Sequence, residues 1–134
     1  MQTFLPYNNF QKSVECLDYK RLGKQRVEAM QILNILLSNK KTGGWVNHPA
    51  VKMWRGYENA LALYMNTCII EWIKRGYNNT MKIFVVFEGE VKYPGWFGDL
   101  NFHASHRSNL LRKDHKYYSK FGWVEPTDLP YVWN

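Results

Sequence analysis

The spacing of apolar residues predicts a long amphipathic helix that begins near the amino terminus. With about 100° of rotation per residue, the centre of one helix face between Asp18 and about Ser38 is apolar, formed by Leu22, Ala29, Leu33, Leu36 and Leu37. The Asp18 side chain is expected to cap this helix, because its oxygens can accept hydrogen bonds from the first free N–H groups.

Polar residues follow the border of this apolar face. Arg21, Gln25 and Glu28 stand together at i, i+4 and i+7, and Asp18 and Arg26 point close to them. A base, an amide and an acid at such a border could form the floor of a pocket. A row of ion pairs on a solvated helix face explains the same pattern.

A glycine interrupts the same helix at position 23. Gly23 costs roughly 1 kcal/mol relative to alanine in a helix. It indicates a close approach by another backbone or by a ligand, although chance is an adequate alternative.

The stretch from Tyr57 to Arg75 predicts a second, central helix that stops at Gly76. Apolar residues surround most of its circumference, which is typical of a buried helix. Glu58 projects into this apolar arc. A carboxylate there is either paired, with Arg55 as the partner, or used in acid–base chemistry.

Asp99 is expected to cap a third helix, from Leu100 to Lys113. One face of this helix is shared by His103, Arg107, Leu110, Leu100 and Leu111. A histidine and an arginine one turn apart on a core-facing side suggest an anion site. A hydrogen-bonded structural pair explains them equally well.

The first half of the chain contains shorter elements as well. Pro6 prevents a helix in Met1–Tyr7, which should lie extended across the core and could bring the amino terminus near a site. Asn8 or Asn9 can cap a short helix over residues 10–17. The basic, glycine-rich stretch Lys40–Gly44 predicts a turn, and Pro49 begins another helix.

The rest of the second half is irregular. Residues 81–92 alternate weakly and predict a short strand or an extended loop. Tyr93–Gly98 is predicted to form a turn with exposed aromatic residues. Pro126–Asn134 is predicted to form an apolar tail that docks on the body of the protein. Together the elements predict a mainly α fold: a compact single-domain bundle, residues 1–134, of three main helices with long loops and an aromatic C-terminal segment.

The composition of the chain favours a polyanionic partner. The chain of 134 residues has a net charge of +7 and contains six Trp, nine Tyr and seven Phe, more aromatic residues than a core of this size requires. Excess basic charge favours nucleic acid or a nucleotide. No run reaches the roughly 18 apolar residues of a membrane span, and the first residues do not resemble a signal peptide. We therefore expect a cytoplasmic protein without a membrane partner.

The cysteines and histidines do not form a known metal signature. Cys16 and Cys68 are isolated among apolar residues and are expected to be buried and reduced. The histidines are too scattered for a zinc site: His48, His103, His106 and His115. There is also no P-loop or dinucleotide-binding glycine motif, so neither a metal nor another cofactor is expected.

Basic and aromatic residues alternate between Lys113 and Trp123. Such a segment is suited to phosphate contacts combined with stacking on bases. Lys113, Lys116, Tyr117 and Tyr118 are its candidate nucleic-acid contacts.

Three segments resemble the pyrimidine-dimer DNA glycosylase family, the small phage-type endonuclease V enzymes. Leu17-Asp-Tyr-Lys-Arg-Leu is similar to the start of the family's first long helix, and Tyr57–Asn78 to its central helix with the ending Lys-Arg-Gly-aromatic-Asn. Lys116-Tyr117-Tyr118 resembles the aromatic, basic segment that the family uses on DNA. The order and spacing of the segments carry the resemblance, since no single motif is specific.

The resemblance implies a compact helical enzyme that cuts the glycosidic bond of a dimerised pyrimidine. The N-terminal α-amine would attack the sugar carbon and form an imine that permits strand cleavage, assisted by a glutamate on the first long helix. This chemistry is plausible without a metal, because α-amines have a pKa of about 8 and are partly unprotonated at neutral pH.

Two positions depart from the family pattern. The bulky Gln2 is expected to leave Met1 in place, so that Met1 supplies the amine if one is used. Literal alignment also puts Arg21 where the family has its glutamate, and Glu28 comes nearest only with a slip of one position. Glu28 and Glu58 are therefore candidate acids from helix geometry alone.

Two functions remain open from the sequence. The first is a metal-independent glycosylase, with or without lyase activity, acting on a damaged or modified pyrimidine in DNA. The second is a non-catalytic protein that binds nucleic acid or sequesters a nucleotide on the same fold. Met1, Glu28 and Glu58 are the candidate catalytic residues. The candidate binding residues are Arg21, Lys24, Gln25, Arg26, His48, Arg55, His103, His106, Arg107, Lys113, Lys116, Tyr117 and Tyr118.

Overall fold

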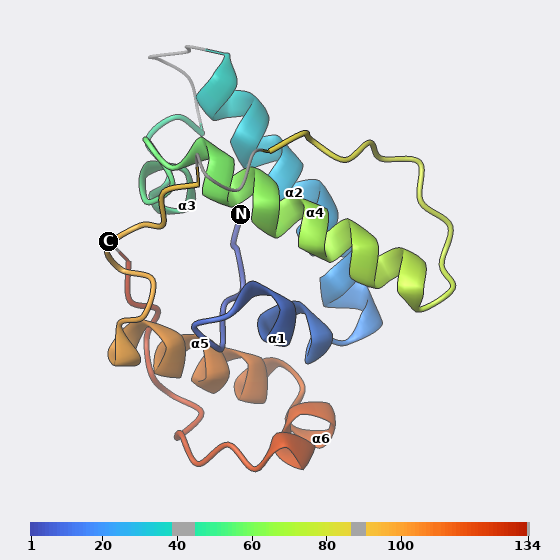
Figure 1. Cartoon of the computed structure of the whole chain (residues 1–134). Coiled ribbons are helices and arrows are strands. Elements are labelled where there is room, and N and C mark those ends of the chain that lie inside the picture. Colours follow the sequence, from blue (N-terminus) through green and yellow to red (C-terminus); the bar gives the residue numbers. More distant parts are fainter. Residues whose placement is uncertain (39–44, 87–90, 134) are drawn as a thin grey trace.

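The computed structural model describes residues 1–38, 45–86 and 91–133 (Figure 1). The turn predicted at Lys40–Gly44 lies outside the described residues. The helices are α1 (Phe10–Glu15), α2 (Tyr19–Leu37), α3 (Pro49–Lys52), α4 (Glu58–Lys74), α5 (Leu100–Lys113) and α6 (His115–Tyr118), followed by a 3₁₀ turn at Ser119–Phe121.

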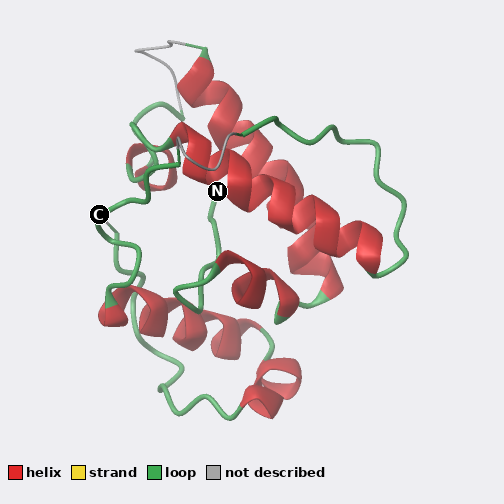
Figure 2. Cartoon of the chain, viewed as in Figure 1, coloured by secondary structure: helices red, strands yellow, loops and turns green. Residues whose placement is uncertain are grey.

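The mainly α fold with three main helices, α2, α4 and α5, is confirmed. Figure 2 shows the described chain as helices joined by loops, with no strand among the described residues. The described part of the segment predicted as strand or loop, residues 81–86, is an extended loop. Its backbone at Phe84 is tied to α4 by both polar groups of the Asn66 side chain, at 2.7 and 2.9 Å.

Side-chain caps determine where three of the helices begin. Asp18 accepts a hydrogen bond from the Arg21 amide at the start of α2, and Asn9 accepts one from the Lys12 amide at the start of α1. Asp99 accepts from two amides at the start of α5. The predicted caps Asp18 and Asp99 are therefore confirmed, and Asn9 is the cap of the two candidates for α1.

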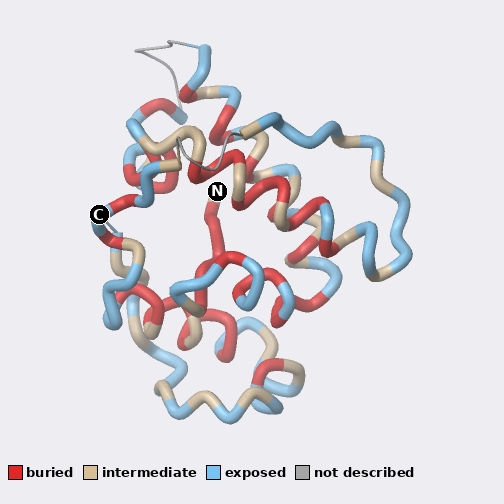
Figure 3. The backbone as a smooth tube through the Cα atoms, viewed as in Figure 1, coloured by how far each residue is buried: buried red, intermediate tan, exposed pale blue. Residues whose placement is uncertain are grey.

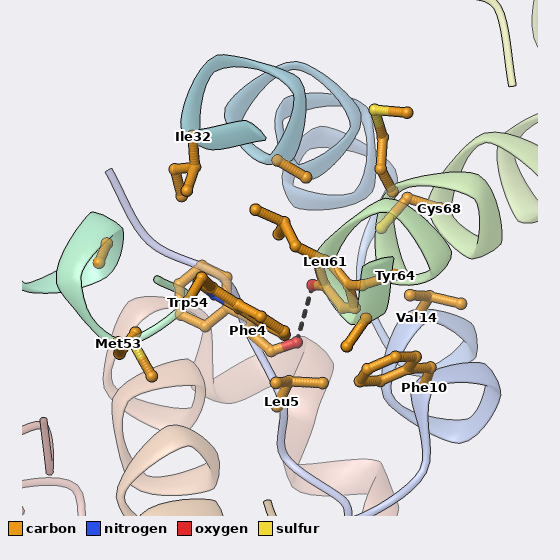
Figure 4. Packing of buried hydrophobic residues seen from close by; sticks show 14 of the residues in the cluster. Phe4, Leu5, Phe10, Val14, Ile32, Met53, Trp54, Leu61, Tyr64 and Cys68 are labelled. Atoms are coloured by element: carbon orange, nitrogen blue, oxygen red, sulfur yellow. Dashed lines mark hydrogen bonds between the residues drawn. The ribbon is translucent and has the colours of Figure 1, made fainter. Parts of the chain in front are cut away.

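The core lies between the α2–α4 pair and the helices packed below it (Figures 1 and 4). Phe4 and Leu5 of the amino-terminal segment pack among Leu61 and Tyr64 of α4. Figure 3 shows this segment as buried along most of its length. The prediction that Met1–Tyr7 lies extended across the core is confirmed.

Several apolar residues assigned to helix cores are exposed instead. Ile70 and Ile73 are each 51% exposed, because α4 packs against α1 and α2 on one side only. Leu37 lies in the last turn of α2 and is half exposed, and Leu100, the first residue of α5, is 83% exposed. The prediction that this helix is buried over most of its circumference is wrong at Ile70 and Ile73, in the C-terminal part of α4.

The turn at Tyr93–Gly98 also differs from its prediction. Trp96 is buried and donates from Nε1 to the Met53 carbonyl at 3.0 Å, while Tyr93 is exposed. Trp96 packs edge-on against Trp54, with 4.9 Å between ring centroids. This turn therefore closes the core instead of presenting all its rings to solvent.

The close approach predicted at Gly23 is made by the side chain of Trp72. A Cβ atom at Gly23 would lie 3.0 Å from the indole ring of Trp72. Trp72 is fixed there by stacking on Tyr77 at 4.4 Å and by a hydrogen bond to the Asn78 carbonyl. Glycine thus lets α4 and its following loop pack onto α2.

Both cysteines are buried and free, as predicted. Burial raises the pKa of the Cys16 thiol to about 12, so it remains protonated at neutral pH. No helix in the described ranges combines the length and the apolar character that a membrane crossing requires.

Candidate functional site

A cavity of about 410 Å³ opens where the first half of α2, the amino-terminal segment and the C-terminal tail meet. Its volume falls in the range of roughly 300–1,000 Å³ that is usual for ligand sites. The lining residues are Met1, Gln2, Phe4, Lys20, Arg21, Lys24, Gln25, Glu28, His48, Lys113, Tyr131 and Trp133.

Gln25 fixes the amino-terminal segment against α2. Its Oε1 accepts from the Phe4 amide at 2.9 Å, and its Nε2 donates to the Gln2 carbonyl at 2.9 Å. The Tyr64 hydroxyl donates to the same Oε1 at 2.7 Å. A buried amide with these three partners has one orientation, so Gln25 determines where the chain enters the cavity.

Glu28 binds the backbone next to the first residue. Its Oε2 accepts from the Gln2 amide at 3.1 Å and from Gln25 Nε2 at 3.2 Å. The carboxylate is half-buried and lines the same cavity as Met1. The structure thus brings together Arg21, Gln25 and Glu28, the polar border predicted from the helix pattern, beside the start of the chain.

Two histidines of α5 hold the amino-terminal segment from the opposite side. The Leu5 amide donates to His106 Nδ1 at 2.9 Å. His103 Nε2 accepts from the Gly98 amide at 2.9 Å, so its Nδ1 carries the proton and donates to the Leu5 carbonyl at 2.7 Å. Burial lowers the pKa of both rings, that of His106 to about 3.

Arg107 of α5 also binds the amino-terminal segment. It donates to the Pro6 carbonyl at 2.7 Å and pairs with Glu125 at 2.5 Å. None of the three α5 residues lines the cavity. The contacts of His103, His106 and Arg107 support the structural alternative for this face, not the anion site.

His48 also lines the cavity, at the start of α3. Its Nδ1 accepts from the Ala50 amide at 3.0 Å as the helix cap, which leaves Nε2 as the proton-bearing nitrogen of the neutral ring. Burial, and then the positive charge of the N-terminal amine, lower the pKa of His48. At neutral pH it is an uncharged hydrogen-bond donor close to that amine.

Basic side chains surround the cavity mouth. Lys24 and Lys113 are exposed, and Lys20 joins them on the lining. Arg21 also lines the cavity and forms an ion pair with Asp18 at 3.1 Å. This concentration of positive charge beside one carboxylate is suited to a phosphate-bearing ligand.

The inward position predicted for Glu58 is wrong. Glu58 is the first residue of α4, and its Oε1 turns back to accept from the Gly56 amide at 3.2 Å. It lines a separate hollow, and Arg55 instead donates to the Val46 carbonyl at 3.2 Å. The reason is local, because Glu58 is the first residue of α4 and its carboxylate binds a backbone amide of the turn that precedes the helix.

The aromatic, basic segment is also arranged differently from the prediction. Tyr118 is fully buried, its hydroxyl hydrogen-bonds to Asp18, and its ring stacks on Trp123 at 5.7 Å. It therefore cannot stack on a base. Tyr117 is half-buried beneath Lys120, and Lys116 is exposed.

Arg26 lies outside the cavity as well. Its guanidinium lies 4.3 Å from the centre of the Trp72 ring and donates to Asn79 at 2.7 Å. These contacts tie the loop after α4 to α2. The contacts of Arg26 are therefore structural, whereas the preceding residue, Gln25, lines the cavity.

One cavity wall was missed from the sequence, the one formed by Tyr131 and Trp133. Small polar residues on the buried face of α5 hold the tail that carries these rings. Ser105 accepts from the Val132 amide at 3.2 Å, Ser108 from the Leu129 amide at 3.1 Å, and Asn109 donates to the Leu129 carbonyl at 3.1 Å. Such a polar stripe at i, i+3 and i+4 within a helix core was the available signal.

Comparison with known families gives a match to the first part of the chain. The sequence model described as pyrimidine dimer DNA glycosylase covers residues 1–85, which include Met1, Gln25, Glu28 and His48. Searches of curated proteins and of solved structures found no match. Since the matched region is more than half of the 134 residues, the chain belongs to the pyrimidine dimer DNA glycosylase family.

Proposed function

We propose that this protein is a DNA glycosylase that removes a damaged pyrimidine and then cleaves the strand as a lyase, with the α-amine of Met1 as nucleophile and the carboxylate of Glu28 as the assisting group. The observation that carries the proposal is the hydrogen bond from the Gln2 amide to the Glu28 carboxylate. It keeps a carboxylate one residue from the amine, inside a cavity with a basic rim. The family implies a DNA substrate.

The chemistry uses groups present on the chain. The unprotonated amine attacks C1′ of the sugar, and the bond between C1′ and the base nitrogen breaks, so that the base leaves with the electron pair and takes up a proton. The attached nitrogen loses a proton, and its lone pair then forms a double bond to C1′ while the bond between C1′ and the ring oxygen breaks. The ring oxygen takes up a proton, and a protonated imine results. Loss of a C2′ proton then expels the 3′ phosphate.

Glu28 and His48 have distinct roles in this proposal. The Glu28 carboxylate stabilises the positive charge that develops on the sugar and accepts protons from the attacking amine. His48 donates from Nε2 to a sugar or phosphate oxygen, since its Nδ1 is occupied by the Ala50 amide. Lys20, Lys24 and Lys113 hold the flanking phosphates.

A non-catalytic nucleic-acid- or nucleotide-binding protein is the second candidate. It is favoured by the bulky Gln2, which is expected to leave Met1 in place, and by Arg21, which lies on the cavity wall where literal alignment expects the family's glutamate. A nucleotide ligand would bind with weak salt dependence. A DNA surface with several phosphate contacts would lose affinity steeply as salt rises.

The test is the pair of substitutions Glu28→Gln and Glu58→Gln. We expect Glu28→Gln to reduce excision of a cyclobutane dimer from duplex DNA by at least about 100-fold while binding stays within about threefold of wild type. Glu58→Gln, a matched change outside the cavity, should leave excision within about twofold. Excision and binding are measured with one end-labelled duplex.

Other outcomes have defined meanings. Wild-type protein that binds the duplex without excising the base would support the second candidate. Equal excision by wild type and Glu28→Gln would contradict the role of Glu28.

A further inference from the structure

The Glu28 side chain lies between two hollows of the surface. It lines the cavity that contains Met1, and it also lines a neighbouring groove of about 440 Å³ formed by α2 and Trp72 of α4. Because a glutamate side chain has several staggered rotamers, its carboxylate has more than one orientation available. The orientation of Glu28 therefore depends on its neighbours.

The nearby lysines do not select between these orientations. Lys20 and Lys24 line both hollows, so their charge attracts the carboxylate to either side. Lys24 is one helical turn from Glu28, a spacing at which opposite charges attract each other. The ion pairs found in the described part of the chain nevertheless do not include Glu28.

Gln25 makes the contact that selects one orientation of the carboxylate. Its Nε2 donates to Glu28 Oε2 at 3.2 Å and to the Gln2 carbonyl at 2.9 Å. The Gln2 amide donates to the same Oε2 at 3.1 Å. Among the described residues, the hydrogen bonds of this carboxylate all fall on Oε2. Oε1 is thus the oxygen that remains for a ligand or a proton.

The Gln25 amide is itself fixed, because both of its ends have partners. Gln25 is 1% exposed, and its Oε1 accepts from the Phe4 amide at 2.9 Å and from the Tyr64 hydroxyl at 2.7 Å. The Tyr64 hydroxyl also contacts the Phe4 carbonyl at 2.8 Å (Figure 4). A flipped amide would place its oxygen against a carbonyl and a carboxylate, so Nε2 is kept toward Glu28.

We propose that Gln25 is a positioning residue for the excision reaction: it holds Oε2 of Glu28 on the protein and leaves Oε1 to accept the proton of the attacking Met1 amine. The same side chain holds the Gln2 carbonyl, so one amide sets the distance between nucleophile and carboxylate. Since Gln25 is buried, it acts through these two residues and not on the substrate. This inference rests on the proposed function for its reaction.

The test uses three variants. Gln25→Glu keeps an acceptor for the Phe4 amide but replaces the donor that faces Glu28 with an oxygen. Gln25→Met has a similar length, lacks the donor and adds no charge, so it provides the test if Gln25→Glu does not fold. Thr3→Val is the matched control, because it removes the acceptor of the Trp54 indole, at 3.0 Å, from the same segment and leaves the Gln25 contacts in place.

Steady-state excision of a cyclobutane dimer from duplex DNA gives kcat and KM for each protein. We expect both Gln25 variants to lower kcat by about 10- to 100-fold, the effect of misplacing a reacting group by about 1 Å, with KM within about threefold of wild type. Thr3→Val should lower the melting temperature but leave kcat within about twofold. Equal losses of kcat in Thr3→Val and Gln25→Glu would overturn the proposal, and so would wild-type kcat in both Gln25 variants.

Hydrogen exchange of the Gln2 amide separates this inference from the proposed function. It is measured by NMR on the free protein. We expect exchange to be at least about 10-fold faster in Gln25→Glu than in wild type, because the acceptor Glu28 is no longer held, and at most about threefold faster in Thr3→Val. A wild-type protein that excises nothing would refute the glycosylase activity, while exchange would still decide the role of Gln25. Unchanged exchange in both Gln25 variants would overturn that role.

Discussion

At the residue scale, Asp18 illustrates how one side chain joins a helix cap to the C-terminal segment. Its oxygens accept hydrogen bonds from the Arg21 amide, the Arg21 guanidinium and the Tyr118 hydroxyl. Burial opposes ionisation of this carboxyl, but the hydrogen bonds outweigh it, and the pKa of Asp18 is lowered from 3.8. The start of α2, which carries the cavity residues, is thereby fixed to α6.

Replacing Tyr118 with Phe should therefore destabilise the protein by about 1–3 kcal/mol at pH 7, since it leaves a buried carboxylate with one donor fewer. A lowered folded-state pKa contributes stability that is present above pH 3.8 and is lost as the pH falls through the folded-state pKa. The difference between Tyr118→Phe and wild type should shrink in that acidic range. Urea denaturation as a function of pH measures it.

If the free energies of unfolding of Tyr118→Phe and wild type differ by the same amount at every pH, the Tyr118 hydroxyl does not stabilise ionised Asp18. The substitution Tyr117→Phe is the control, because the neighbouring hydroxyl makes only a long contact of 3.5 Å to the Leu17 carbonyl. It should change stability by less than about 0.5 kcal/mol.

At the element scale, the amino-terminal segment is held on two sides by side chains instead of by a neighbouring strand. Gln25 binds it from α2, and His103 and His106 bind it from α5. Backbone groups buried in the core require such partners. The amino-terminal segment, which begins with Met1, thus connects α2, which carries Glu28, to α5.

The buried histidines should make the stability of the folded protein sensitive to acid. The pKa of His106 is lowered from 6.5 to about 3, so the unfolded state binds a proton that the folded state does not. Its contribution to stability is complete above pH 6.5 and is lost as the pH falls from 6.5 towards 3. We expect His106→Leu to be less stable than wild type at pH 7 and to show a flatter decline over that range.

His115→Leu is the control for this titration, because His115 is exposed. It should leave the pH dependence of the melting temperature unchanged. A steep acid decline that persists in His106→Leu would assign the effect to other groups, of which His103 is the nearest candidate.

At the scale of the whole molecule, the periodic parts were predictable and the contacts between distant segments were not. The three main helices, the caps Asp18 and Asp99, and the polar border Arg21–Gln25–Glu28 follow from local spacing and capping chemistry. Glu58 and Tyr118 were misplaced because helix wheels do not show that a carboxylate turns back to a backbone amide before its helix, or that a tyrosine pairs with Asp18, 100 positions away.

The cavity itself depends on such distant contacts. Met1, Glu28, His48 and Trp133 come from four separate parts of the chain. The sequence named Met1, Glu28 and His48 as separate candidates, Glu28 from helix geometry alone, and it did not name Trp133. The tail wall required the placement of α5, whose serines and asparagine bind a backbone about 20 residues further along.

The central claim is that the α-amine of Met1 is the nucleophile beside Glu28. Wild-type protein is incubated with dimer-containing or abasic duplex and sodium borohydride, and the intact mass and N-terminal peptide of the product are measured. Hydride reduction of an imine would fix the sugar on the nitrogen of Met1, with Met1 retained. The predicted result is a covalent adduct on that peptide. Absence of any adduct, or an adduct on a lysine instead, would contradict the claim.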